Sequence, residues 1–423
     1  MSVSKRKWTT EKGEEREAWV VRYADANGDR HIATFKRKKE AEEYHDTVRV
    51  DVRTGTHVAP SKSVTVAQAG KAWIRACEAA ALERTTVDAY QQHLTYHILP
   101  YLGTMRLSSI TVATVRDWQD RLRLGTPPAG ATEGAPRSAD MVRRVTRSLG
   151  TLLADAQEVG AVGQNVVRTM SSRRKKAKGK GERRANRKLR VGVDIPAPVE
   201  IRGILAKAEG RWRPLLLVAV FCGLRASELR GLRWEDVDLK TGDLHVRQRA
   251  DRYNAIGAPK SEAGERTVPI PPSVLQALRE WKLICPRRRA SDPDTPAELH
   301  FVFPNGRGMV ETHANIAQRG LAPAQIAAGV TVPVKDEEGR PVRDDDGKPM
   351  VTAKYPGLHA LRHFYASWCI NRVADGGLEL PLKVVQTRLG HSSITMTADT
   401  YGHLFARADD SAELAAGERL LLG

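Results

Sequence analysis

The sequence predicts a multidomain protein that is mainly α-helical with small β elements. Its 423 residues exceed the length of an ordinary single domain. Apolar residues recur at helical spacing from residue 64 to 168, and a dense run of Lys and Arg follows at 173–190. We therefore expect four parts: a small sheet with one helix in residues 1–60, a helical domain in 61–170, a basic linker in 171–194, and a mixed α+β domain with a C-terminal tail in 195–423.

The first part has the pattern of a hairpin followed by a helix. Trp19, Val21 and Tyr23 alternate onto one face, and Asn27-Gly28 is a strong signal for a tight turn. Residues 36–53 have the spacing of a charged amphipathic helix. Such a module could be a structural cap, but the basic residues on its flanks favour contact with DNA.

The second part is expected to contain four helices. Their apolar positions include Trp73 in the first helix, Leu94 in the second and Trp118 in the third. We expect Pro100 to end the second helix, Thr111 to cap the third, and the fourth to run from about residue 138 to 159. The aromatic residues here are expected to form a core and not a surface on which bases stack.

The linker is the most basic segment of the chain. Residues 173–190 contain eleven Lys or Arg and one Glu, so 11 − 1 = +10 of the chain's formal charge of +18. We expect a solvated segment that orders across phosphates, with Arg173, Arg174, Lys175, Lys176, Arg183 and Arg184 as candidate DNA contacts. Neutralising Lys175, Lys176, Arg183 and Arg184 should weaken binding to all sequences and flatten its salt dependence.

The fourth part mixes helices and strands. Helices are expected at 199–208, 212–222, 228–232 (capped by Ser227) and 272–283, with strands at 244–249, 266–270 and 301–304. Lys260 lies in the loop between the first two strands. Two acidic turns within residues 330–353 lack the ligand spacing of a calcium loop and are interpreted as hairpin turns.

The overall charge and the cysteines limit the class of protein. The net charge of +18 and pI of about 9.9 point to a polyanionic partner, usually nucleic acid. Four separated cysteines indicate neither a zinc site nor a disulfide framework. The start of the chain lacks a secretory signal, and the longest apolar run, 215–222, is too short to span a bilayer. These features indicate a reduced, cytoplasmic protein without a membrane partner.

Four short motifs in the C-terminal half together supply a phenol, two guanidinium groups and two imidazoles. They are Gly223-Leu-Arg225-Ala-Ser-Glu-Leu229, His359-Ala-Leu-Arg362-His363, Leu389-Gly-His391 and Asp399-Thr-Tyr401-Gly-His403. A tyrosine hydroxyl can attack a phosphodiester if a base or a cationic surround helps it lose its proton. Two arginines can hold the phosphate oxygens, and a lysine or histidine can protonate the departing oxygen. No divalent ion, cofactor or ATP is then compulsory.

In order and spacing, these motifs resemble those of the tyrosine recombinases, and within them the phage-integrase group. Residues from 62 onward resemble the helical core-type DNA-binding domain of that family. The first 60 residues resemble the arm-type DNA-binding domain of lambda-type integrases, and residues 195–423 the catalytic domain. The resemblance implies DNA integration and excision by a mobile element through a 3′-phosphotyrosyl intermediate.

The resemblance also implies roles for individual residues. Tyr401 matches the nucleophile, and Arg225 and Arg362 match the two arginines that clamp the phosphate. His359 matches the proton acceptor for the tyrosine, and His391 a hydrogen-bond donor to the phosphate. Lys260 matches the lysine that acts as general acid, with Arg266 as a second basic residue nearby. Glu228 is expected to support the structure, as is His363, while His403 has no assigned role.

The family resemblance implies double-stranded attachment sites as the substrate and a homotetramer on DNA. It also implies a host DNA-bending protein and a directionality factor as further partners. The expected location is the cytoplasm and nucleoid of a bacterium. The tail after Tyr401 is expected to form a helix that docks on a neighbouring subunit, with packing on its own domain as the alternative. Two other functions stay open: a type IB topoisomerase, and a non-catalytic DNA-binding regulator on the same scaffold.

Overall fold

The structure is a computed structural model that describes residues 2–9, 15–25, 28–53, 63–170, 188–288, 298–336, 338–405, 415 and 418–422. Contacts divide the chain into two units, residues 1–184 and 185–423. The six candidate DNA contacts of the linker lie outside the described residues. The division into four parts stays a prediction. No helix in the described ranges is long and apolar enough to cross a membrane.

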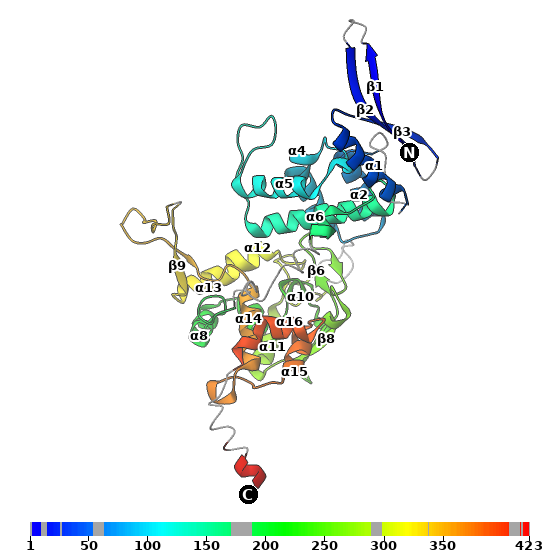
Figure 1. Ribbon diagram of the computed structural model, residues 1–423. Helices are drawn as coiled ribbons and strands as arrows, with labels where there is room; N and C mark the ends of the chain where they lie inside the picture. Colours follow the sequence, from blue (N-terminus) through cyan, green and yellow to red (C-terminus); the bar gives the residue numbers. More distant parts are fainter. Residues whose placement is uncertain are drawn as a thin grey trace. The chain divides into compact units, whose positions relative to one another are not determined.

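The N-terminal module is a three-stranded antiparallel sheet with one helix (Figure 1). Its elements are β1 Ser2–Thr9, β2 Glu15–Ala24, β3 Arg30–Phe35 and α1 Lys38–Arg53. Val21 and Tyr23 are buried and Trp19 is partly buried against α1, which confirms the predicted face of the hairpin. The prediction of two strands was incomplete. Strand β1 is charged and largely exposed, so it has no clear apolar alternation, yet it pairs with β2 along its whole length.

The helical module that follows packs around Trp73, Leu94 and Trp118. Its elements are α2 Val66–Ala79, α3 Arg84–His93, the π-helical segment Leu94–Ile98, α4 Leu99–Leu102, a 3₁₀ turn Leu107–Ser109, α5 Val112–Leu124 and α6 Ala139–Glu158. The Thr111 cap is confirmed. The expectation that Pro100 ends its helix was wrong. The π turn shifts the hydrogen-bond register just before it, so Pro100 lies in the first turn of α4, where a missing N–H is tolerated.

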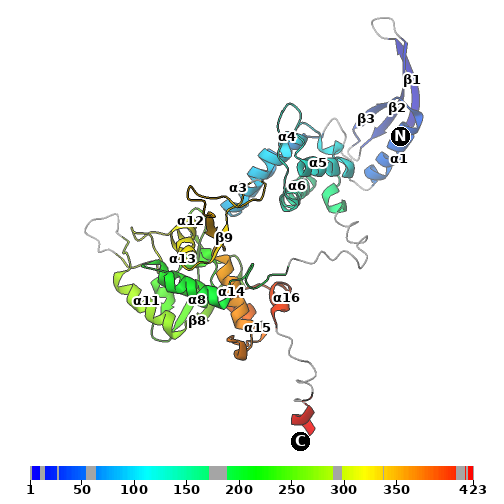
Figure 2. The same cartoon turned by 90° about the vertical axis from the view of Figure 1, so that its left-hand side faces the viewer.

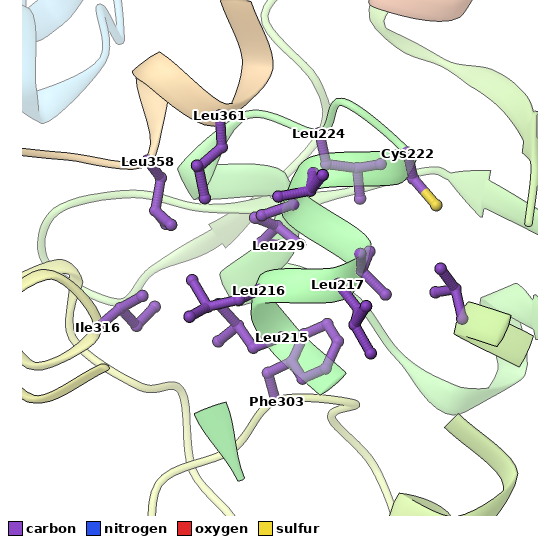
Figure 3. Packing of buried hydrophobic residues seen from close by; sticks show 14 of the residues in the cluster. Leu215, Leu216, Leu217, Cys222, Leu224, Leu229, Phe303, Ile316, Leu358 and Leu361 are labelled. Atoms are coloured by element: carbon purple, nitrogen blue, oxygen red, sulfur yellow. The ribbon is translucent and has the colours of Figure 1, made fainter. Parts of the chain in front are cut away.

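The C-terminal unit is built around α9. Its helices are α8 Pro198–Lys207, α9 Trp212–Phe221, α10 Ala226–Gly231, α11 Pro272–Ile284, α12 His313–Asn315, α13 Ala322–Ala327, α14 His359–Ile370, α15 Leu382–Leu389 and α16 Ile394–Tyr401. A π-helical segment, Ile316–Leu321, joins α12 to α13, and 3₁₀ turns lie at Trp234–Asp236, Glu262–Gly264, Val373–Asp375 and Gly402–Leu404. Helix α9 contacts α8, α11 and α14. Buried side chains of Leu216, Leu224, Leu229 and Leu361 converge in this core (Figure 3).

Small antiparallel sheets complete the unit. They are β4 Val237–Asp238, β5 Asp243–Val246 and β8 Arg266–Pro269 in one sheet, β6 Arg249–Ala250 with β7 Ile256–Gly257, and β9 Thr331–Pro333 with β10 Val351–Ala353. Residues 301–304 are buried but make only isolated bridges, so the predicted strand there was wrong. The two acidic turns close at Gly339 and Gly347, which confirms them as hairpin turns.

Three C-terminal helices bring the motifs together. In both views α14, α15 and α16 form one group, coloured orange to red (Figures 1 and 2). Helix α15 contacts α14, α16 and strand β8. Because α14 also packs on α9, the helix that ends just before Arg225, the ends of all these elements meet in one place.

Candidate active site

Arg225 lies at the start of α10. Its backbone N–H donates to Glu228 Oε2 at 2.8 Å, and its guanidinium donates to Glu228 Oε1 at 2.7 Å and to the Gly390 carbonyl at 2.9 Å. The predicted cap at Ser227 was wrong, since the helix begins at Ala226. The carboxylate of Glu228, the third helical residue, reaches back to the residue that precedes the helix, as in a capping box. The side chain of Arg225 stays 35% exposed, so a ligand can reach it.

Glu228 is a buried carboxylate that joins two arginines. Arg266, whose side chain is also buried, donates to its two oxygens at 3.2 and 2.9 Å. Arg266 is held in turn by the carbonyls of Arg388 and Gly264, at 2.7 and 2.9 Å. Burial alone would raise the pKa of Glu228, but the charges of Arg266 and Arg225 outweigh it and the pKa is lowered. Glu228 is therefore ionised at neutral pH and fixes the direction of Arg225.

Arg362 lies in the first turn of α14 and is almost fully buried. It donates to the Gly223 carbonyl at 2.7 Å and to the Leu389 carbonyl. Burial, and then the charge of Arg225, lower the pKa of Arg362 to about 9, so the guanidinium still carries its charge at neutral pH. Carbonyl acceptors orient this cation without neutralising it, which leaves its charge available for a phosphate.

Two glycines permit the close approaches that assemble the site. Gly223 has φ +63°, and a Cβ there would lie 2.1 Å from Cδ1 of buried Tyr365 on α14. Gly390 has φ +64°, and a Cβ there would lie 2.8 Å from the Ala263 carbonyl oxygen. A residue with a side chain is strained in this left-handed region and would also clash at both places. The sequence motifs need glycine here for these steric reasons.

His391 follows Gly390 and is buried. Its Nδ1 lies 2.9 Å from the hydroxyl of Thr397, and its ring is parallel to that of Tyr401, with centroids 6.3 Å apart. Burial, and then the charges of Arg362 and Arg225, lower the pKa of His391 to about 4. His391 is therefore neutral at neutral pH, and in that form one ring nitrogen donates a hydrogen bond while the other accepts one.

Tyr401 is the last residue of α16 and is 1% exposed. Its hydroxyl lies 2.8 Å from Nδ1 of His363. Burial raises the pKa of Tyr401 to about 12, while Arg362 and Arg225 act in the opposite direction. Both arginines also bond to the carbonyls of the two residues before His391, whose ring is parallel to that of Tyr401. The contact with His363 was not predicted from the sequence, although His363 directly follows Arg362.

His359 and His363 are one helical turn apart on α14, and their ring centroids are 4.3 Å apart. His359 is exposed by its surface area, yet partial burial, and then the charges of Arg362 and Arg225, lower its pKa. Since the contact with the phenol is made by His363, the role of His359 as proton acceptor stays a prediction. His403 Nε2 lies 2.7 Å from the Leu189 carbonyl and anchors the chain just after Tyr401.

Lys260 is exposed in the loop between β7 and the 3₁₀ turn Glu262–Gly264. The carbonyl of Ala263, in that turn, lies against Gly390 beside His391. The loop that carries Lys260 therefore reaches the edge of the site, and its role as general acid stays a prediction.

The cluster places one phenol beside two fixed guanidinium groups and neutral imidazoles. The two cations can stabilise the negative charge of a phosphate, and the phenol can attack its phosphorus. These features define a class of site that transfers phosphodiester bonds through a tyrosine.

Known proteins are similar to this chain in sequence and in fold. Residues 198–407 match the phage integrase family, and residues 65–123 match the phage integrase N-terminal SAM-like domain. A tyrosine recombinase XerC-like protein of Caldanaerobacter subterraneus is 24% identical over 89% of this chain and 88% of its own length. The prophage integrase IntR of Escherichia coli is 33% identical over 27% of this chain and 30% of its own.

Two solved structures share the fold. The integrase of transposon Tn1549, in complex with a circular-intermediate DNA, covers 85% of this chain and 100% of its own, with a TM-score of 0.58 and 20% identity. A lambda integrase dimer bound to a core site covers 93% of each chain, with a TM-score of 0.51 and 16% identity. The chain belongs to the phage integrase family of tyrosine recombinases.

Proposed function

We propose that this protein is the site-specific DNA recombinase of a phage or other mobile element, and that it cuts and rejoins strands through a 3′-phosphotyrosyl bond to Tyr401. The observation that carries the proposal is that Arg225 and Arg362, from distant parts of the chain, bond to the carbonyls of Gly390 and Leu389, directly before His391, whose ring is parallel to that of Tyr401. Tyrosine, the two arginines and His391 together meet the needs of attack on a phosphodiester.

In the proposed reaction, the Tyr401 oxygen forms a bond to phosphorus as the bond from phosphorus to the 5′ oxygen breaks. Arg225 and Arg362 hold the phosphate oxygens as their charge grows, and His391 donates a further hydrogen bond. Lys260 gives a proton to the departing 5′ oxygen, and His359, whose ring centroid lies 4.3 Å from that of His363, is the final acceptor of the phenol's proton. A 5′ hydroxyl of the partner strand then attacks the phosphotyrosine, which restores a phosphodiester without ATP.

Related proteins suggest the assembly. Solved complexes include a lambda integrase dimer on a core site and a lambda integrase tetramer on a Holliday junction. For this chain we propose double-stranded attachment sites and a homotetramer on DNA, in the nucleoid of a bacterial cytoplasm, with a host DNA-bending protein and a directionality factor as further partners. Leu420, Leu421 and Leu422 are highly exposed, as expected for a tail that docks on a neighbouring subunit.

A nicked suicide substrate tests this function, because the cut end diffuses away and the covalent adduct accumulates. The wild-type protein should form an adduct that survives denaturing electrophoresis. Tyr401→Phe should form none and still bind the site. Tyr96→Phe changes an exposed tyrosine and serves as the matched control. An adduct with Tyr401→Phe would refute the assignment of the nucleophile.

The same substrate separates the two remaining alternatives. Relaxation of supercoiled DNA without site preference or strand exchange would indicate a type IB topoisomerase. Tight binding without any adduct from the wild-type protein would indicate a non-catalytic regulator.

A further inference from the structure

We propose that His363 is the positioning residue of the nucleophile: its Nδ1 atom accepts a hydrogen bond from the Tyr401 hydroxyl and so fixes the oxygen that attacks the phosphate. The inference rests on the proposed function and deepens it. None of the roles assigned above to His359, His391 or Lys260 includes this contact.

The position of His363 is fixed by its neighbours. Arg362, the preceding residue, is buried and donates to the carbonyls of Gly223 and Leu389. These bonds hold the first turn of α14, so the imidazole of His363 starts from a rigid backbone. Its Nδ1 lies 2.8 Å from the Tyr401 oxygen, and the two rings meet at 62° with centroids 5.7 Å apart. This is a full hydrogen bond between rings that meet edge to face.

The direction of this hydrogen bond follows from counting donors and acceptors. Within the described residues, His363 is the hydrogen-bond partner that the structure gives to the Tyr401 hydroxyl. If Nδ1 carried the proton, the phenolic hydrogen of a residue that is 1% exposed would have no acceptor. If the phenol donates, its hydrogen has the Nδ1 lone pair as its acceptor. His363 Nε2 is also not among the buried atoms of the described chain that lack a partner. The hydroxyl therefore donates and Nδ1 accepts.

The charges around His363 keep it in the form that accepts. Burial, and then His359 and Arg362, lower the pKa of His363 to about 4, against a smaller opposite effect of Asp194. At neutral pH the imidazole is neutral, and with Nε2 protonated its Nδ1 lone pair faces the phenol. A charged imidazole would have no acceptor to offer.

Helix α16 is held at two points one turn apart. Thr397 contacts His391 at 2.9 Å, and Tyr401 contacts His363 at 2.8 Å. Residues four apart lie on the same face of a helix, so these contacts fix both the rotation of α16 and the torsion of the phenol. Loss of the contact to His363 removes the hydrogen bond that directs the tyrosine oxygen.

The test measures single-turnover cleavage of the suicide substrate at saturating protein, with gel-shift binding and thermal melting of each variant. His363→Phe keeps an aromatic ring, although a larger one, and removes the acceptor. We expect cleavage to slow about 100-fold, since displacement of a reacting atom by about 1 Å has an effect of that size. Site binding should stay within about threefold, because the arginines that we propose hold the phosphate are unchanged.

His363→Asn is the matched variant, because its Oδ1 lies near the place of Nδ1 and accepts a hydrogen bond without taking a proton. It should restore cleavage to within about tenfold of wild type. Cleavage by His363→Phe at or above the wild-type rate would overturn the proposal, and so would His363→Asn that is as slow as His363→Phe. If His363→Phe does not fold, His363→Leu takes its place, and it must likewise cleave more slowly than His363→Asn.

Failure of this proposal is distinguishable from failure of the proposed function. The function fails if the wild-type protein forms no adduct that depends on Tyr401. The positioning role is refuted only if the cleavage rates of the His363 variants do not follow the expected order while the wild-type protein still cleaves.

Discussion

Substitution of Gly223 by alanine should disturb the fold and the site together. The new Cβ would lie 2.1 Å from Cδ1 and 2.7 Å from Cε1 of Tyr365, well inside van der Waals contact. Tyr365 is 1% exposed, so its ring cannot swing into solvent. The carbonyl of Gly223 also accepts from Arg362, and Arg225 lies two residues further along the chain. Any shift that relieves the clash therefore moves both arginines.

The expected size follows from two costs. A side chain at φ +63° costs about 1 to 2 kcal/mol, and overpacking in a rigid core costs about 1 to 3 kcal/mol. Their sum is about 2 to 5 kcal/mol, centred near 3.5 kcal/mol, which changes the unfolding equilibrium about 300-fold at 1.4 kcal/mol per factor of ten. For a unit of this size about 2 to 4 °C is lost per kcal/mol, so the melting temperature of the C-terminal unit should fall by about 7 to 14 °C.

Scanning calorimetry of the full chain measures this shift, and the suicide substrate measures cleavage below the melting temperature. Gly257→Ala is the matched control, because a Cβ there meets no atom within 4 Å and its φ is not positive. The control should melt and cleave like wild type. If Gly223→Ala melts within about 1 °C of the control and cleaves at its rate, the steric argument for this glycine is wrong.

Three further predictions concern the groups around the phenol. Glu228→Gln should lower stability by about 3 to 5 kcal/mol in a thermal melt, because Arg266 would keep a buried charge without its partner; a variant as stable as wild type would contradict this. Thr397→Val should slow cleavage about tenfold because His391 loses its hydrogen bond, while Thr397→Ser should not; equal rates for the two variants would count against a positioning role. The pKa values of His363 and His391 are lowered to about 4 from an ordinary value near 6.5. Between these two pH values the unfolded chain binds more protons than the folded chain, so stability should fall as the pH falls from about 6.5 to about 4. The double variant with asparagine at both positions should lose less stability between pH 7 and pH 5, and an unchanged slope would refute the reasoning.

Local rules predicted much of the fold. The helices around Trp73 and Trp118 follow from apolar spacing, and the Thr111 cap follows from its hydroxyl, since each signal lies within one or two helical turns. Strand β1 was missed because its residues are mostly charged and exposed, so no apolar alternation marks it in the sequence. What makes it a strand is its pairing with β2. The π turn before Pro100 was missed because a shift in hydrogen-bond register leaves no residue signature.

The residues of the site also divide into those that local sequence motifs predict and those that depend on the packing of distant elements. Arg225, Arg362, His391 and Tyr401 could be chosen from their motifs, and the structure brings them into one cluster around Leu389 and Gly390. The contact between His363 and Tyr401 joins two helices, so it depends on how α14 and α16 pack, and no local pattern encodes that packing. Adjacency to Arg362 was the only sequence signal available for His363.

The near-complete burial of Tyr401 has a consequence for the covalent bond that we propose it forms. Water is present at far higher concentration than any DNA end, and it would hydrolyse a phosphotyrosine irreversibly and leave a broken chromosome. A tyrosine that is 1% exposed is shielded from bulk solvent, and a linkage that kept this shielding would favour attack by the hydroxyl of a DNA strand already held in place. Exclusion of solvent would thus protect the genome during the interval in which its continuity depends on one side chain.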